Sequence, residues 1–139
     1  MNDTTGRGDI SEIQVAAALM RRGRRVLRPI SSGLRYDLLI DDGDGTFSRV
    51  QCKTGLMKDG FIVFRARNFD ARRPSDVSYR GQIEAFGVFC PQNGRTYLVP
   101  MAPLTASDST ARLRLRPARN GQRTGVRRAE EFDISDAPP

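Results

Sequence analysis

The sequence predicts a single α/β domain, and two observations carry that prediction. The chain has 139 residues, which is enough for one compact core and too few for two. A segment near the N-terminus has the periodicity of an amphipathic helix, and the segments after it are short and alternate as strands do. No internal repeat breaks this order, so we expect one domain over residues 1–139.

Residues 6–22 are predicted to form the helix, because their apolar side chains share one continuous arc while Ser11 and Gln14 lie on the polar side. Glu12 falls inside the apolar arc, where a carboxylate is costly unless another group pairs with it. The alternative is a capping box, in which Asp9 caps the helix and Glu12 is its third residue. Gly23 is a plausible C-terminal stop.

Short strands are expected after the helix, at residues 24–29, 35–41, 47–54, 60–64, 83–90 and 96–99. The stretch Asp42-Gly43-Asp44-Gly45 is a strong turn signal between the second and third of these. If this turn places Asp41 opposite Phe47, Asp37 faces Gln51 across an antiparallel pair. A second hairpin is predicted around residues 91–94, and a short helical turn in the last ten residues.

Two later segments are strongly basic. Residues 65–82 lack periodicity and predict a mobile or ligand-facing loop, whereas residues 109–129 contain no acid and alternate arginine with leucine. Such alternation is typical of a strand with one positive face. A solvated basic face is the plain interpretation, and contact with a DNA backbone is the functional one. The candidate DNA-binding residues are Arg67, Arg72, Arg73, Tyr79, Arg112, Arg114 and Arg116.

The charge balance favours a polyanionic partner. The chain carries 23 basic and 16 acidic residues, a net charge of +7, and its isoelectric point is about 10.4. Nucleic acid is the first candidate partner, and an anionic membrane surface is remote because no basic amphipathic helix with bulky aromatics is evident. No apolar run has the length of a membrane span or a signal peptide, so we expect a cytoplasmic protein of bacterial or phage type.

The absence of histidine excludes several kinds of active site. Ser-His-Asp triads, Cys-His dyads, histidine-metal nuclease sites and mixed Cys/His zinc sites all require it. Cys52 and Cys90 are too few for a four-thiolate zinc site and are expected to be free thiols. The chemistry must therefore rest on carboxylates, amides, arginine and lysine, and only Lys53 and Lys58 are lysines.

Four residues fit the needs of phosphodiester hydrolysis, which requires a hard cation held by oxygens and a positive group beside the phosphate. Gln51 and Lys53 share one face of a strand, roughly 6.5–7 Å apart along it. Asp37, the Gln51 amide oxygen and the Cys52 backbone carbonyl could hold Mg²⁺, with Glu12 joining directly or through water. Lys53 could orient the attacking water or neutralise developing phosphate charge.

Each of these residues also has a plainer interpretation. Asp37 could be a strand-edge charge paired with Arg35 or Arg49, and Gln51 could be a solvated amide. Lys53 could be an exposed edge lysine that opposes aggregation. Their order on the predicted elements, and a lysine in a chain that otherwise uses arginine, favour a shared site.

The motifs resemble those of the PD-(D/E)XK nuclease superfamily. The resembling stretches are G-R-G-D-I-S-E (6–12), R-Y-D-L-L-I-D (35–41) and R-V-Q-C-K-T-G (49–55), with a weaker likeness at Y-R-G-Q-I-E-A-F (79–86) and Y-L-V-P (97–100). The nearest branch has Gln-x-Lys and includes small intron-encoded homing endonucleases. The resemblance implies a restriction-endonuclease-like α/β core, with a central mixed β-sheet flanked by helices. It matches Glu12 to the acidic helix residue, Asp37 to the metal-binding aspartate, and Gln51 with Lys53 to the (D/E/Q)-x-Lys pair.

The resemblance also implies a function. It predicts an endonuclease that cuts double-stranded DNA with Mg²⁺, or Mn²⁺ as a substitute, at specific sites and as a homodimer or homotetramer. A Holliday-junction or structure-selective resolvase on the same core is the alternative enzyme, and a non-catalytic DNA-binding module is the alternative of another class. Three departures stand out: Tyr36 replaces the proline of the superfamily name, Gln51 removes one negative charge, and Glu84 stands where the branch often has aspartate.

Overall fold

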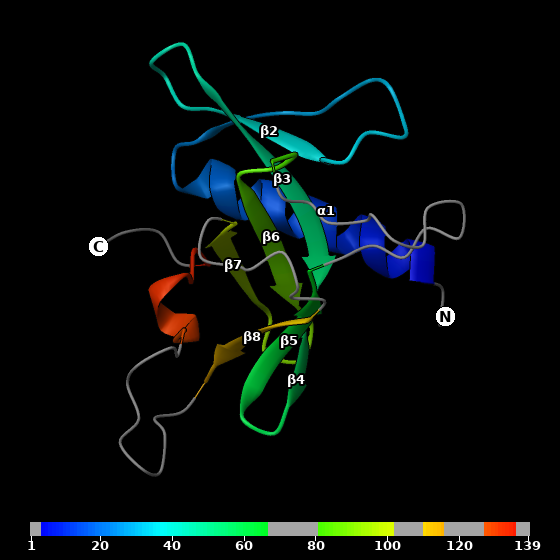
Figure 1. Cartoon of the computed structure of the whole chain (residues 1–139), viewed down its shortest axis with the longest axis vertical. Coiled ribbons are helices and arrows are strands. Elements are labelled where there is room, and N and C mark those ends of the chain that lie inside the picture. Colours follow the sequence, from blue (N-terminus) through cyan, green and yellow to red (C-terminus); the bar gives the residue numbers. More distant parts are fainter. Residues whose placement is uncertain (1–3, 67–80, 102–109, 116–126, 136–139) are drawn as a thin grey trace.

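The computed structural model describes residues 4–66, 81–101, 110–115 and 127–135. One helix packs on one face of a five-stranded sheet, and a smaller three-stranded sheet lies against the other face (Figure 1). The predicted α/β class and the mixed central sheet are confirmed. None of the described helical residues forms an apolar segment of membrane-spanning length.

Helix α1 (Thr4–Arg21) begins before the predicted start. Asp9 and Glu12 therefore lie within the helix, so the capping-box interpretation is wrong. Its buried face is narrower than the apolar arc of the sequence and consists of Ser11, Val15, Ala18 and Leu19. Ser11, which the periodicity places on the polar side, is buried because it finds a polar partner on the sheet.

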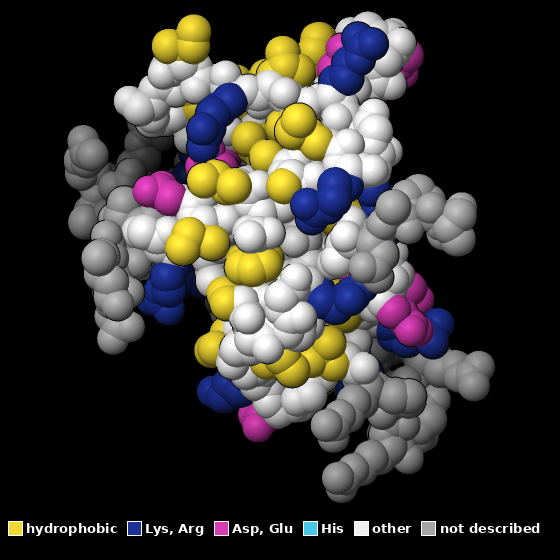
Figure 2. Space-filling view, turned by 180° about the vertical axis from the view of Figure 1, so that it is seen from behind, with side chains coloured by type: hydrophobic (Ala, Val, Ile, Leu, Met, Phe, Trp, Pro, Cys, Tyr) yellow, Lys and Arg dark blue, Asp and Glu magenta, His cyan; other side chains and the backbone are white. Residues whose placement is uncertain are grey.

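The outward face of α1 remains apolar. Ile10, Ile13 and Met20 are each more than half exposed. Viewed from the helix side, hydrophobic side chains are spread across this face of the molecule (Figure 2). The periodicity therefore predicted the helix but not how much of its apolar arc the sheet covers.

The five-stranded sheet has the order β1-β2-β3-β6-β7. Its strands are β1 (Arg25–Leu27), β2 (Leu38–Asp41), β3 (Phe47–Thr54), β6 (Ala85–Cys90) and β7 (Arg95–Pro100). Strands β3 and β6 pair in parallel and every other neighbouring pair is antiparallel. The bounds of β3 agree with the predicted 47–54, and the hairpin of β6 and β7 around residues 91–94 is confirmed.

The register between β2 and β3 follows from the turn signal. Asp41 pairs with Phe47, as predicted, and the ladder continues to Leu38 opposite Val50. Strand β2 begins at Leu38 rather than at residue 35, so Asp37 lies one position beyond the pairing. The turn uses Gly43 and Gly45 at positive φ, 88° and 89°.

The second sheet contains β4 (Leu56–Lys58), β5 (Phe61–Arg65) and β8 (Thr110–Arg114) in the order β4-β5-β8. Strand β4 escapes sequence analysis because it has three exposed residues and no alternation to detect. A 3₁₀ turn, η1 (Ala129–Glu131), lies near the expected C-terminal helical turn. The basic segment predicted as a loop lies outside the described residues from 67 to 80.

Two hydrophobic clusters flank β6, whose six residues are all buried. On the helix side, Val15 and Leu19 of α1 pack with Leu38, Ile40, Val50 and Phe89. On the other side, β6 and β7 pack against the second sheet, and the rings of Phe64 and Phe86 lie 5.3 Å apart. Cys52 and Cys90 are free thiols, as predicted.

Gly87 sets how closely α1 approaches β6. A Cβ atom at this position would lie 2.5 Å from Cγ1 of Val15, well inside van der Waals contact. Because Val15 is fully buried, it has no space into which it can move. The helix therefore lies against backbone at this point, and that close approach fixes its distance from the sheet.

We expect Gly87→Ala to lower the free energy of unfolding by about 1–3 kcal/mol, because the new methyl group must displace Val15. Urea unfolding measures the effect. Gly8→Ala is the matched control, since Gly8 lies in α1 with nothing within 4 Å of its added Cβ. It should be neutral or stabilising by up to about 1 kcal/mol. Equal stability of the two variants would contradict this account of the packing.

Candidate active site

Side chains alternate along β3, and this decides which of its residues face the helix. Val50 lies in the core with Val15 of α1, and the Thr54 hydroxyl bonds to the helix. Gln51 and Lys53 therefore lie together on the opposite face, as their spacing predicts. Both side chains are half-buried.

Asp37 is held against the backbone of β3. Its own backbone nitrogen donates to the Val50 carbonyl at 2.8 Å. Its carboxylate oxygen Oδ2 accepts a hydrogen bond from the Cys52 nitrogen, also at 2.8 Å. The register argument predicted that Asp37 faces Gln51 across the ladder. Instead the ladder ends one residue earlier, at Leu38, and the Asp37 side chain accepts a hydrogen bond from the Cys52 amide.

The Cys52 carbonyl lies on the same side of β3 as this hydrogen bond. In a strand, the N–H and C=O of one residue point to the same neighbour, and the Cys52 N–H points to Asp37. The thiol of Cys52 is not a plausible metal ligand, because burial raises its pKa and the charges of Asp37 and Glu12 raise it further. The backbone oxygen is thus the donor that Cys52 offers.

The charges of the candidate residues act on one another. Burial raises the pKa of Asp37, and the nearby charge of Glu12 raises it too, whereas the Cys52 amide and Lys53 oppose the rise. Asp37 therefore lies within electrostatic reach of both Glu12 and Lys53. The net result is a raised pKa, which means that the charged form of Asp37 is disfavoured. A bound cation would stabilise that charged form.

Lys53 is not an edge lysine. Its side chain is half-buried, on a strand that pairs with both β2 and β6, so the interpretation as an exposed edge lysine is wrong. Burial lowers the pKa of Lys53 to about 8, and Arg35 and Arg65 lower it as well, while Asp37 raises it. Asp37, Arg35 and Arg65 therefore all lie within electrostatic reach of its ammonium group.

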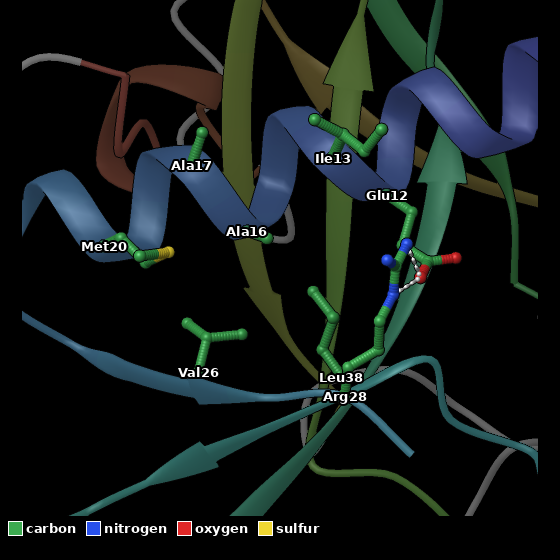
Figure 3. A pocket seen from close by; sticks show the side chains of 8 residues that line it. All are labelled: Glu12, Ile13, Ala16, Ala17, Met20, Val26, Arg28 and Leu38. Carbon is green, nitrogen blue, oxygen red and sulfur yellow. Dashed lines mark hydrogen bonds and ion pairs between the residues drawn. The ribbon is translucent and has the colours of Figure 1, made fainter. Parts of the chain in front are cut away.

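Glu12 has the partner that its place in the apolar arc demanded. Arg28, just after β1, donates from Nε at 2.9 Å and from Nη2 at 2.8 Å to the same carboxylate oxygen. The two side chains close one end of a groove of about 290 Å³ whose walls are otherwise apolar, between α1 and strands β1 and β2 (Figure 3). Arg28 was not predicted from the sequence. The only indication was that Glu12, a carboxylate in an apolar arc, needs a partner.

Glu84 is tied to Arg49 rather than to the site. It accepts hydrogen bonds from the backbone nitrogen of Arg49 at 2.7 Å and from Nε at 2.9 Å. These bonds from Arg49 lower the pKa of Glu84. Arg49 is therefore occupied, and the plain interpretation that pairs it with Asp37 is wrong.

The donor set suits a hard divalent cation. Among the described residues, no group of three or more His, Cys, Asp or Glu side chains is placed to hold a metal. The available donors are the carboxylates of Asp37 and Glu12, the Gln51 amide and the Cys52 carbonyl. All are oxygens, which Mg²⁺ and Mn²⁺ prefer, and Mg²⁺ commonly keeps several waters beside one or two carboxylates. The residues present therefore fit such an ion.

One face of the second sheet is positively charged. Arg65 pairs with Thr110, and Val63 and Phe61 pair with Arg112 and Arg114, so the three arginines share a face. The opposite face is buried, which confirms the predicted alternation for Arg112 and Arg114. Their guanidinium groups lie 5.8 and 4.7 Å from the centre of the Phe61 ring. We call Arg65, Arg112 and Arg114 the arginine face.

Arg65 was missed from the sequence, although it continues the alternation of β5. The other candidate DNA-binding residues lie outside the described part of the chain; they are Arg67, Arg72, Arg73, Tyr79 and Arg116.

The family model for PD-(D/E)XK endonucleases matches residues 2–135, so the chain belongs to that family. Among solved structures it is similar to a bacterial homing endonuclease, I-Ssp6803I, with a TM-score of 0.68 and 23% sequence identity. That match covers 97% of this chain and 89% of the other. None of the curated proteins matches the chain. The family and fold predicted from the motifs are thereby confirmed, and the chain is a nuclease.

The depressed pKa of Lys53 makes stability depend on pH. The unfolded chain binds more protons than the folded chain between the folded pKa of about 8 and the ordinary value of 10.5. Lys53 should therefore make the free energy of unfolding rise across this interval, by at most about 3 kcal/mol. Urea unfolding of the parent and Lys53→Met at several pH values measures the difference. Identical pH dependence of the two proteins would contradict it.

Proposed function

We propose that the chain is a Mg²⁺-dependent endonuclease that cuts double-stranded DNA at specific sites, with Mn²⁺ as a substitute. The observation that carries the proposal is the placement of Asp37. Its carboxylate is half-buried, bonded to the Cys52 amide, and within electrostatic reach of both Glu12 and Lys53. The family membership of the chain supports the chemistry, and its likeness to a homing endonuclease supports the site-specific form.

Each residue has a role in this proposal. Asp37, the Gln51 amide oxygen and the Cys52 carbonyl would hold the ion, and Glu12 would join directly or through water. When bound, Mg²⁺ acidifies a water and neutralises charge on the phosphate. Lys53, with a pKa of about 8, is mostly charged at neutral pH and so suits the stabilisation of developing phosphate charge.

The arginine face provides a path for the DNA backbone. It begins near Lys53, because the charge of Arg65 acts on that residue. It then follows β5 and β8 away from the site for roughly 13 Å, the length of four strand residues. Such a row of guanidinium groups would contact successive phosphates on one side of the scissile bond.

A break in both strands requires two active sites, and one chain supplies one set of candidate residues. We therefore propose that the enzyme acts as a homodimer or homotetramer, since symmetric assembly supplies a second site in a fixed relation to the first.

The main test compares digestion of linear duplex, supercoiled plasmid and a four-way junction in Mg²⁺ and in EDTA. The parent should cut duplex DNA only in Mg²⁺. Asp37→Ala and Lys53→Ala should each slow cleavage by at least about a hundredfold, because each removes a group that acts at the reacting phosphate. DNA affinity should stay within about twofold of the parent, since neither residue belongs to the arginine face.

Asp44→Ala is the control for this test. Asp44 is an exposed carboxylate in the β2–β3 turn that bonds only to Thr46 in the described structure, and its loss should leave cleavage unchanged. Near-parental nicking by Asp37→Ala would overturn the proposed site. Preference for the four-way junction would indicate a structure-selective resolvase, and DNA binding without any nicking would indicate a non-catalytic module.

Gln51→Glu should tighten Mg²⁺ binding several-fold, on the order of 1 kcal/mol, because it replaces a neutral oxygen donor by a charged one. Calorimetry without DNA measures this change. Gln82→Glu adds the same charge at an exposed position outside the candidate donor set and should leave the affinity unchanged. Equal effects of both variants would show that Gln51 is not a ligand.

Arg112→Gln and Arg114→Gln should each weaken DNA binding and reduce the log–log salt slope by about 0.9 per lost phosphate contact. Saturated turnover should change little, because these side chains lie away from the reacting phosphate. Arg25→Gln, at an exposed position on the edge strand β1, provides the control. If neither variant changes the salt dependence of binding, the DNA does not contact the arginine face.

A further inference from the structure

A pair of hydroxyl groups, on the buried Ser11 and the half-buried Thr54, joins α1 to β3. The Ser11 and Thr54 side-chain oxygens lie 2.6 Å apart and share a hydrogen bond. Ser11 is 1% exposed, so water cannot replace Thr54 as its partner. We call these two residues the hydroxyl pair. Nothing in the proposed chemistry uses either of them.

The hydroxyl pair lies next in sequence to the candidate site on both elements. Ser11 precedes Glu12 on the helix, and Thr54 follows Lys53 on the strand. Cys52, whose amide holds Asp37, is two residues before Thr54 and faces the same side of the sheet. The bond therefore links the helix that carries Glu12 directly to the strand that carries Gln51 and the Cys52 carbonyl.

Other contacts of the helix with the sheet do not fix its position to the same degree. Val15 and Leu19 pack against apolar side chains, and Val15 meets Gly87. These contacts set the separation of helix and sheet, but apolar attraction has no preferred direction. A hydrogen bond is directional, and one residue of a helix corresponds to 1.5 Å of rise and 100° of rotation. A small slide or turn of α1 would thus carry the Glu12 carboxylate away from Asp37.

The far end of α1 is held separately. Arg22 donates from Nε to the Ile134 carbonyl at 3.2 Å and from Nη2 to the Asp133 carbonyl at 3.3 Å. These bonds tie the C-terminal end of the helix to the last described segment of the chain. They lie three turns from Glu12. Arg28, from the segment after β1, holds the Glu12 carboxylate itself, and the hydroxyl pair is the directional contact that ties α1 to β3 beside it.

We infer that Ser11 and Thr54 are positioning residues, whose hydrogen bond sets the place of Glu12 relative to Asp37 and the Cys52 carbonyl. The inference rests on the proposed function, because it assigns the pair a role in assembling that same site. Neither residue touches the substrate or the ion. Loss of the bond should therefore weaken the site while leaving the DNA surface intact.

The test uses Thr54→Val, which keeps the shape and removes the hydroxyl, and Thr54→Ser, which keeps the hydroxyl. Ser11→Ala and the double variant Ser11→Ala/Thr54→Val complete a double-mutant cycle. Four quantities are measured on each full-length protein: Mg²⁺ affinity by calorimetry without DNA, the single-turnover rate at saturating DNA, the DNA dissociation constant and urea stability.

Thr54→Val and Ser11→Ala should each weaken Mg²⁺ binding and slow the single-turnover step by about tenfold, the scale of losses in groups that orient metal ligands. The DNA dissociation constant should stay within about twofold. Thr54→Ser should restore both affected quantities to near-parental values. The double variant should be no worse than either single one, because both remove the same bond.

Ser135→Ala is the matched control. The Ser135 hydroxyl accepts a hydrogen bond from the Thr96 backbone nitrogen at 2.7 Å, on strand β7, which is separated from β3 by β6. Its loss should lower stability without changing Mg²⁺ affinity or the cleavage rate. A purely structural hydroxyl pair would behave in the same way as this control.

The outcomes separate the two proposals. Folded Thr54→Val with parental Mg²⁺ affinity and rate would overturn the positioning role alone, provided that the parent cuts DNA in Mg²⁺. If Thr54→Val does not fold, Ser11→Ala is judged by the same criteria. A parent that neither binds Mg²⁺ nor cuts would overturn the proposed function and the positioning role together.

Discussion

The hydrogen bond from the Cys52 amide to the Asp37 carboxylate is the contact on which the candidate site depends. It joins Asp37, which lies just before the first paired residue of β2, to Cys52 of the central strand β3. A carboxylate in this half-buried place loses part of its hydration, and the backbone donor offsets only some of that cost. The part of the hydration that the amide does not replace leaves the charged carboxylate unfavourable, and a bound cation would stabilise it.

Lys53 and Glu12 lie on opposite sides of the central strand β3. Lys53 lies on the face of β3 that points away from the helix, within electrostatic reach of Asp37, Arg35 and Arg65. Glu12 approaches from the helix side and is balanced by Arg28. Acidic and basic groups thus reach the central strand from different directions.

Local signals account for the parts of this structure that could be predicted. The turn glycines and the alternation of side chains predicted the bounds of β3 and the pairing of Asp41 with Phe47. Both features depend on residues that are close in sequence. The order of Glu12, Asp37 and Lys53 on three elements predicts a common site, and in the structure the charges of Glu12 and Lys53 both act on the pKa of Asp37.

The remaining features depend on contacts between distant residues, which periodicity cannot reveal. Arg28 pairs with Glu12 from 16 residues away, and Ser11 is buried because Thr54 comes from 43 residues away. Strand β4 has three residues and, among the described strands, pairs with β5 alone. The end of the β2 ladder at Leu38, which decides that Asp37 binds an amide rather than facing Gln51, depends on how the sheet twists and closes.

The parallel pairing of β3 with β6 has a consequence for how this domain can evolve. Val50 lies opposite Ala85, so a long stretch of chain must close before the central pair of strands can form. The entropic cost of such a closure grows only with the logarithm of its length, by about 0.6 kcal/mol for each doubling. Insertions in the loops of this connection are therefore cheap in thermodynamic terms, whereas β5, which lies within it, is fixed by its buried Ile62 and Phe64.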